Sequence, residues 1–266
     1  MNKKLLIPLF VAGMAIPAFA HGSEISGVNA YYIGEYGEKA AYLEHGKKIN
    51  GQLADEGFVL LKNDGTFPME KGSKITVVGK ASIDLARGGA GSGSIKSWDA
   101  GKVTLEQSLT DAGFEVNQTA TNFYKSAPGG RTNGNDNWAG NSEVTIGETP
   151  IKNVTDNSGL IESFGQYDDL AIQVIAREGS EGCDVLTIDA TDSTKFGTST
   201  KHALELSDNE QALYDELKNH FDHILILVNS SNIFECDQFM DDSSCAGILW
   251  IGNPGDVGPG AIGRIL

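Results

Sequence analysis

Three carboxylates lie within seven residues of the chain, in the segment 177–184, REGSEGCD. Glu178, Glu181 and Asp184 are separated there by two glycines, a serine and a cysteine, and the segment follows the apolar run LAIQVIA at 170–176. Such a run, bounded by acids and glycines, is typical of a buried strand, so the carboxylates occupy the loop at its C-terminal end. The segment is either a solvated acidic turn or a ligand site, because ligands of open α/β sheets bind at that edge.

The elements that position this loop are indicated by the apolar pattern of the chain. Short runs that are nearly continuous in Ile, Leu and Val occur at 75–78, 170–176, 223–229 and 245–251. They are separated by segments with helical spacing, and strands of this kind are buried on both faces of a parallel sheet. The sequence predicts an α/β fold, a doubly wound and mainly parallel sheet with helices on both faces, which is an α/β sandwich.

Capping residues indicate where several helices begin and end. Thr104 with Gln107 and Ser207 with Glu210 have the spacing of capping boxes, and Gly113 is placed to end the first of these helices. The apolar spacing of residues 50–61 is also compatible with a helix.

Three loops are expected to leave the C-terminal ends of strands. They are ARGGAGSG at 86–93, REGSEGCD at 177–184 and NSSN at 229–232. The glycine-rich loop has neither the GxGxxG spacing directly after the strand nor a following Lys-Ser/Thr pair, so it is a weak phosphate loop. A flexible turn and a ligand-facing loop remain equally open for it, since glycine also marks close approach of the backbone.

Charge excludes one class of partner. The 266 residues carry 36 Asp and Glu against 20 Lys and Arg, for a formal charge of -16. Such a charge repels phosphate backbones and anionic surfaces, so no nucleic-acid partner is expected. The sequence also predicts neither a cofactor nor a metal, because CxxC pairs and histidine clusters with ligand spacing are lacking. Of the three cysteines, Cys236 and Cys245 could form a disulfide that would leave Cys183 over.

The N-terminus has the features of an export signal. Lys3 and Lys4 precede an apolar segment that ends in Ala18-Phe19-Ala20, a cleavage pattern of the small-x-small type. Pro8 and Pro17 interrupt that segment, so an uncleaved membrane anchor is the weaker alternative. Cleavage would remove two lysines and change the charge to -16 - 2 = -18. We expect residues 1–20 to be a signal peptide, no membrane span to remain after cleavage, and the protein to be periplasmic or secreted.

The remaining chain is expected to form one domain. Residues 21–47 are a polar lead-in segment, and the ordered α/β domain runs over 48–266. Residues 128–165 are rich in Gly, Asn, Thr and Ser, which predicts a surface insertion. The final stretch PGDVGPGAIGRIL indicates the start of a helix without a C-terminal cap, so we expect a chain truncated at 266.

Nearly everything after residue 47 resembles the α/β sandwich domain of glycoside hydrolase family 3, the β-glucosidases. The segments that carry the likeness are LADEGFVLLKNDGTFPM, KITVVG, RGGAGSGS, VTLEQSLTDAGFEVN, REGSEGCD, HALELSDNEQALYDEL, ILILVNSSNIFE and GILWIGNPGDVGPGAIGRIL. In most members this domain follows a catalytic TIM barrel. Here it follows an export signal, which resembles the branch of the family with inverted domain order.

The resemblance implies a role for the acidic loop. The family's loop supplies the carboxylate that protonates the glycosidic oxygen, and the matching residue is Glu181, between Ser180 and Gly182. Asp184 matches an aspartate expected to orient the loop or contact sugar, and Glu178 matches no known role. Val185 stands where the family often has arginine, so that sugar contact is in doubt.

The glycine-rich loop is implied to border the same cleft. Arg87, Gly88 and Gly89 are therefore expected to contact substrate, although a solvated surface arginine is an equal alternative for Arg87. Trp250 and Phe234 could stack on sugar, but aromatic residues in strand-like segments are more often part of the core.

A retaining glycosidase needs a second carboxylate ~5–5.5 Å from the acid. In the family it is an aspartate on the barrel, in a motif resembling SDW, and this sequence contains no such motif. The resemblance therefore implies the acid/base half of an exported β-glucosidase-like hydrolase, inactive alone, that needs a TIM-barrel domain in cis or in trans and acts on a β-glucoside or related oligosaccharide. The alternatives are a stand-alone sugar-binding module without catalysis and a flavodoxin-like domain that binds a phosphorylated ligand, which the charge disfavours.

Overall fold

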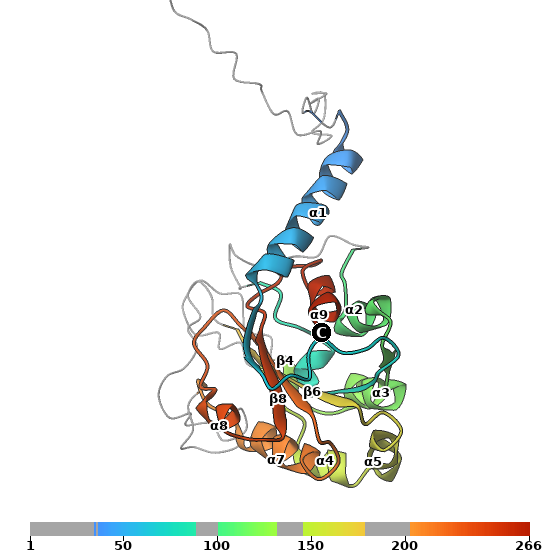
Figure 1. The fold of residues 1–266 in the computed structure, drawn as a ribbon, viewed down its shortest axis with the longest axis vertical. Coiled ribbons are helices and arrows are strands. Elements are labelled where there is room, and N and C mark those ends of the chain that lie inside the picture. The colour runs from blue at the N-terminus through green and yellow to red at the C-terminus, as the bar shows by residue number, and fades with distance from the viewer. Residues whose placement is uncertain (1–34, 36, 89–100, 132–145, 179–202) are drawn as a thin grey trace, which may run out of the picture. The chain divides into compact units, whose positions relative to one another are not determined.

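The fold is described from a computed structural model, which covers residues 35, 37–88, 101–131, 146–178 and 203–266 (Figure 1). The chain divides into a compact unit of residues 1–49 and a second of residues 50–266, and the sheet belongs to the second. No helix within the described ranges is long and apolar enough to cross a membrane. The expected signal peptide at 1–20 lies outside the described residues.

The sheet has six strands in the order β1-β8-β7-β6-β2-β3. All neighbouring strands are parallel except β1, which is antiparallel to β8. The strands span Val59–Asn63 (β1), Lys74–Val78 (β2), Glu115–Val116 (β3), Leu170–Arg177 (β6), Ile224–Ser230 (β7) and Cys245–Trp250 (β8). The predicted doubly wound, mainly parallel sheet is confirmed.

Helices cover both faces of this sheet, which confirms the sandwich. On one face, α2 (Leu105–Ala112) and α9 (Gly260–Ile265) pack against one core cluster. On the other face a second cluster contains residues of α3 (Gln118–Ser126), α4 (Ile151–Thr155), α5 (Ser158–Phe164), α7 (Asp208–Leu217) and α8 (Asp237–Met240). Strand β6 shows the alternation between them, because Leu170 and Ile172 contribute to the first cluster and Ala171 and Ile175 to the second.

The first elements of the domain differ from the expectation of one helix over 50–61. Helix α1 spans Lys39–Gly57, and the chain then becomes strand β1. Val59 pairs with Trp250 and Asn63 with Gly247. The residues VLL at 59–61 are compatible with either a helix or a strand. They form a strand because they pair with β8 at the edge of the sheet, where a helix would have no apolar face to bury.

The predicted caps are largely present. Ser207 and Glu210 form a complete capping box at α7. Thr104 accepts a hydrogen bond from the Gln107 backbone, and Gly113 ends α2 at a φ of 101°. The reciprocal half of that second box is missing, since the Gln107 amide donates to Asp111 instead.

Residues 146–165 correct the prediction of a surface insertion over 128–165. A short antiparallel pair joins β4 (Gly130–Arg131) to β5 (Ile146–Gly147), and α4 and α5 follow directly. Val154, Leu160 and Phe164 are fully buried in the second core cluster. This part of the segment is polar in composition yet supplies core, because three well-placed apolar side chains suffice for two short helices.

The disulfide that the sequence left open between Cys236 and Cys245 is not formed. Cys236 and Cys245 are both free thiols. Cys245 is buried in β8, where its thiol donates to the Gly247 carbonyl at 3.3 Å, and burial raises its pKa to about 11.

Candidate active-site edge of the sheet

The order in which strands are added to the sheet reverses between β2 and β6. From β2 the chain passes through α2 to β3 on one side, and it later returns to β6 on the other side of β2. The next α-helix described after β2 is α2, which packs on one face of the sheet, and the next described after β6 is α7, which packs on the other. In doubly wound sheets this is the switch point, where a crevice opens at the C-terminal ends of the strands.

Gly79 sets how the chain leaves β2. It has a φ of 97°, and a Cβ there would lie 2.7 Å from the Val174 carbonyl oxygen of β6. Only glycine fits this close approach between the two strands at the switch point. A short 3-10 helix, η1 (Lys80–Ser82), follows at once.

Asn229 joins the exits of three strands. Its side-chain amide donates to the carbonyls of Ala86 at 2.8 Å and Gly252 at 2.7 Å, and its oxygen accepts from the Ala86 backbone at 2.6 Å. Asn229 is fully buried at the end of β7, so the expected loop 229–232 begins two residues later than predicted. The loops after β2 and β8 are thereby held beside β7.

Arg87 holds the next part of the same edge. Its guanidinium donates to the carbonyls of Gly255, Asp256 and Val103 at 2.9 to 3.2 Å. Partial burial lowers its pKa, while Asp256 and Asp84 oppose that shift. Arg87 therefore binds main-chain carbonyls of two neighbouring segments, which neither of its two predicted roles anticipated, and its contact with substrate stays a prediction.

Arg177, the last residue of β6, uses all of its donors. Nε donates to the Ala203 carbonyl at 2.6 Å, and the two terminal nitrogens donate to Glu210 at 2.7 Å each. The same nitrogens donate to the carbonyls of Ala176 and Glu205, at 2.9 Å each. The side chains of this ion pair are 5% and 4% exposed. The guanidinium also lies 5.2 Å from the ring centre of Phe234.

A buried carboxyl group lies behind the exit of β2. Glu148 accepts hydrogen bonds from the backbone N–H groups of Lys80 at 3.0 Å and Thr149 at 2.7 Å. Burial raises its pKa to about 8; the Thr149 N–H lowers it, the negative charge of Glu210 raises it further, and the N–H and ammonium of Lys80 lower it. The ammonium itself is held by the carbonyls of Tyr124 and Ala127. Glu148 is therefore a neutral acid near pH 7.

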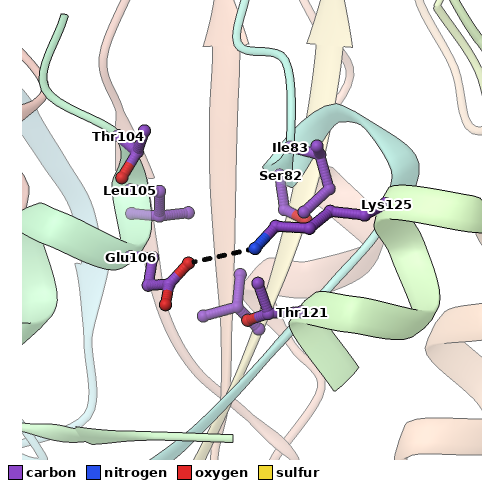
Figure 2. A pocket seen from close by; sticks show the side chains of 8 residues that line it. Ser82, Ile83, Thr104, Leu105, Glu106, Thr121 and Lys125 are labelled. Carbon is purple, nitrogen blue, oxygen red and sulfur yellow. Dashed lines mark ion pairs between the residues drawn. The ribbon is translucent and has the colours of Figure 1, made fainter. Parts of the chain in front are cut away.

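A small pocket opens between η1, α2 and α3 (Figure 2). The side chains of Glu106 and Lys125 point toward one another across it and form an ion pair at 3.8 Å. Its volume of about 50 Å³ is far below the ~300–1,000 Å³ of typical ligand pockets. The lining residues are Val77, Ser82, Ile83, Thr104, Leu105, Glu106, Thr121 and Lys125. This pocket accommodates water rather than a sugar ring.

The predicted site residues divide into two groups. Arg87 and Gly88 lie at the described edge, whereas Gly89, Glu181 and Asp184 lie outside the described residues. Trp250 and Phe234 pack partly buried against the second core cluster, as the core alternative for them predicted. Within the described ranges, no group of three or more His, Cys, Asp or Glu side chains could hold a metal ion.

Sequence reasoning missed three polar residues of this edge. Arg177 and Glu210 are 33 positions apart, and only the capping role of Glu210 was visible as a pattern. Glu148 falls in the segment interpreted as an insertion. The available signal was the position of Arg177, directly after an apolar strand run. A charged residue at the end of a buried strand is almost never buried without a partner, so its position indicates an ion pair.

The six-stranded, mainly parallel sheet with helices on both faces and a switch point between β2 and β6 defines an α/β domain of the doubly wound class. Residues 58–266 match the family described as "Glycosyl hydrolase family 3 C-terminal domain". The chain belongs to this family. The match begins ten residues after the domain start expected at 48.

Known relatives agree with this assignment. The chain is 27% identical over 227 residues to a β-glucosidase of Ruminococcus albus, covering 85% of this chain and 21% of that protein. It is 24% identical over 245 residues to β-glucosidase A of Butyrivibrio fibrisolvens, covering 88% and 28%. The chain thus spans 21% and 28% of the length of these relatives.

Solved structures show the same fold. A β-glucosidase from Paenibacillus barengoltzii superposes with a TM-score of 0.62 at 22% identity, over 83% of this chain and 22% of that one. β-Glucosidase 3B from Thermotoga neapolitana, in complex with glucose, superposes with a TM-score of 0.61 at 21% identity, over 84% and 29%.

Proposed function

We propose that this chain is the acid/base-bearing domain of an exported, β-glucosidase-like retaining glycoside hydrolase. One observation carries the proposal: Glu181 follows, four residues on, the last residue of β6, Arg177, and β6 borders the switch point. Glu181 is assigned the transfer of a proton to the glycosidic oxygen, and then the removal of a proton from the attacking water.

The opposing nucleophile is assigned to another domain. Hydrolysis with retention of the anomeric configuration requires a second carboxylate ~5–5.5 Å from the acid. We assign it to a TIM-barrel domain, either in the same polypeptide (in cis) or in a separate one (in trans). The length of the two relatives, which are named β-glucosidases, supports a larger whole, since this chain covers 21% and 28% of them. A β-glucoside or related oligosaccharide is the proposed substrate, and the chain alone is proposed to be inactive.

The rim of the cleft is assigned to the loops after β2 and β6. Arg87, Gly88, Gly89 and Asp184 are the proposed sugar contacts. The carbonyl contacts of Arg87 hold it against Gly255 after β8 and against Val103 before α2, which supports its place at this rim.

Export is proposed from the first twenty residues. In a bacterial host that processes signal peptides, intact-mass measurement of the exported protein should give a chain that begins at His21. A chain found only inside the cell with Met1 retained would contradict this part of the proposal.

The acid role is tested in the preparation that contains the nucleophile-bearing domain. Glu181→Ala should slow hydrolysis of phenyl β-glucoside by ~10²–10⁴-fold, because its leaving group needs a proton. Dinitrophenyl β-glucoside should react at the first step almost as before, and added azide should restore its turnover because azide attacks without a general base. The expected product is β-glucosyl azide.

A matched control removes a carboxylate from the opposite edge of the sheet. Glu115 is exposed and pairs with Lys74 at the start of β2, so Glu115→Ala should leave both substrates unaffected. Equal losses for phenyl and dinitrophenyl substrates in Glu181→Ala, without azide rescue, would contradict the acid role.

Calorimetry on the chain alone distinguishes the alternative, a stand-alone sugar-binding module, from a domain whose site needs a second domain. Titration with glucose, cellobiose and xylose should release little heat if the site needs the second domain. Strong binding to the isolated chain, unchanged when the nucleophile-bearing domain is added, would favour a binding module.

A further inference from the structure

The exit of β2 is bordered by a small unit that is separate from the six-stranded sheet. Strand β4 pairs with β5, and both strands contact η1, the short helix that follows β2. The Thr149 hydroxyl also donates to the Pro128 carbonyl at 2.9 Å. Residues 128–131 and 146–150 are therefore held to one another, and together they are called the β4–β5 unit.

Lys80 fastens this unit to η1 at two points. Its backbone N–H donates to the carboxyl group of Glu148 at 3.0 Å. Its ammonium donates to the carbonyls of Tyr124 at 2.7 Å and Ala127 at 2.5 Å, which join η1 to the end of α3. The carboxyl group of Glu148 is thus the side-chain link between residues 146–150 and η1.

That link is a buried acid without a paired cation. Glu148 is 9% exposed, and none of the ion pairs between described residues includes it. The ammonium of Lys80 is bound to carbonyls instead. The carboxyl group also packs directly against the backbone, because a Cβ on Gly79 would lie 3.2 Å from Oε2 of Glu148. A charge at such a site is strongly disfavoured, so the closed link favours the protonated acid.

The other groups that face Glu148 leave this preference in place. From α3, the Tyr124 hydroxyl is buried and has no hydrogen-bond partner. Burial raises the pKa of that hydroxyl well above its ordinary value, and the charge of Glu148 raises it further. From α7, the negative charge of Glu210 opposes ionisation of Glu148. Arg177 of β6 is already paired with Glu210 at 2.7 Å. Only Lys80 and the backbone N–H groups favour the carboxylate.

We propose that Glu148 is a proton-dependent latch: the neutral acid holds the β4–β5 unit on η1, and loss of its proton shifts the unit toward an open state in which the carboxylate reaches water. The latch is a local device at the exit of β2, distinct from unfolding of the whole domain. It does not depend on the proposed function, because no substrate and no second domain takes part.

The direction and size of the effect follow from proton linkage. Glu148 has its ordinary pKa of 4.5 in the open unit and a pKa of about 8 in the closed one. Between these values opening releases a proton, so the opening equilibrium constant rises by up to about tenfold per pH unit and is constant below and above them. From pH 5.5 to 8 the rise is at most about 300-fold. Water that enters the closed site reduces it, and we expect at least about tenfold.

Hydrogen–deuterium exchange on the chain alone tests the latch. Wild type and Glu148→Gln should be compared at pH 5.5, 7 and 8.5, since comparison at one pH removes the intrinsic pH dependence of exchange. The amides of residues 147–149 should exchange alike in both proteins at pH 5.5. At pH 8.5 they should exchange at least about tenfold faster in the wild type. The matched control is Glu162→Gln, which neutralises an exposed carboxylate of nearby α5 and should follow the wild type.

A second measurement separates local opening from unfolding of the domain. At pH 8.5, about 1 M urea should leave wild-type exchange over residues 147–149 changed by less than about twofold, because a local opening exposes little surface. Amides of the central strand β7 should exchange severalfold faster in the same urea. Equal acceleration of the two sets would show that Glu148 acts only through global unfolding and would overturn the latch. Equal exchange of wild type and Glu148→Gln at pH 8.5 would overturn it as well.

Discussion

Replacing the buried acid Glu148 with glutamine should stabilise the protein at alkaline pH. The pKa of this carboxyl group is about 8 in the folded chain against an ordinary value of 4.5. Between these values the unfolded state loses its proton while the folded state keeps it, so the free energy of unfolding falls as the pH rises. Below pH 4.5 both states are protonated and no such loss occurs.

The size of the effect follows from the pKa difference. Each pKa unit corresponds to about 1.4 kcal/mol, so the interval from 4.5 to 8 amounts to about 5 kcal/mol. This is an upper value, because water that enters around an ionised Glu148 recovers part of the loss. Glu148→Gln cannot ionise, and its amide oxygen can still accept from the N–H groups of Lys80 and Thr149.

Urea unfolding of the wild type and Glu148→Gln should be compared at intervals between pH 4.5 and 9. The two free energies should lie close together at the acidic end, and the variant should become more stable by several kcal/mol at the alkaline end. Other titrating groups, including the histidines, are common to both proteins and cancel in the difference. Glu115→Gln, at an exposed carboxylate, should follow the wild-type curve. Parallel curves for Glu148→Gln and wild type would refute a raised pKa.

Three further changes test the packing that holds the edge and the sandwich. Asn229→Ala should lower the free energy of unfolding by about 2–4 kcal/mol in urea, because it leaves buried groups of Ala86 and Gly252 without partners. Gly263→Ala should lower Tm and reduce the free energy of unfolding by about 1–3 kcal/mol, since its Cβ would lie 2.1 Å from a carbonyl oxygen of α2. Gly51→Ala, which has open space around it, should instead stabilise α1. Ser207→Ala should cost about 1 kcal/mol in urea unfolding through the lost cap of α7. A neutral result in any of these would contradict the contact concerned.

Local signals in the sequence were sufficient for most of the fold. The central strands are continuous apolar runs, and the Ser207 cap directly precedes the helix that it starts. Both patterns are local, so they could be recognised without knowledge of the fold. Strand β1 was missed because its partner, β8, is remote in sequence. Helices α4 and α5 were missed because a polar composition hid the few residues they bury.

The site was predictable only in outline. The strand pattern predicted that the acidic loop follows the C-terminal end of the strand now seen as β6, whereas the strand order that puts a switch point beside β6 came from the structure. The role of Glu181 came from the resemblance to a family and stays a prediction. The ion pair of Arg177 with Glu210 could not be foreseen, because a charged residue has the same letter whether it is solvated or buried against a partner brought in by the fold.

The antiparallel pairing of β1 with β8 has a consequence for synthesis of the chain. Val59 leaves the ribosome 250 - 59 = 191 residues before its partner Trp250. At a synthesis rate of ~5–20 residues per second, the three apolar residues of β1 remain unpaired for roughly 10–40 s before β8 is made. Nascent chains stalled within that interval should be the ones that chaperones for exposed strands retain.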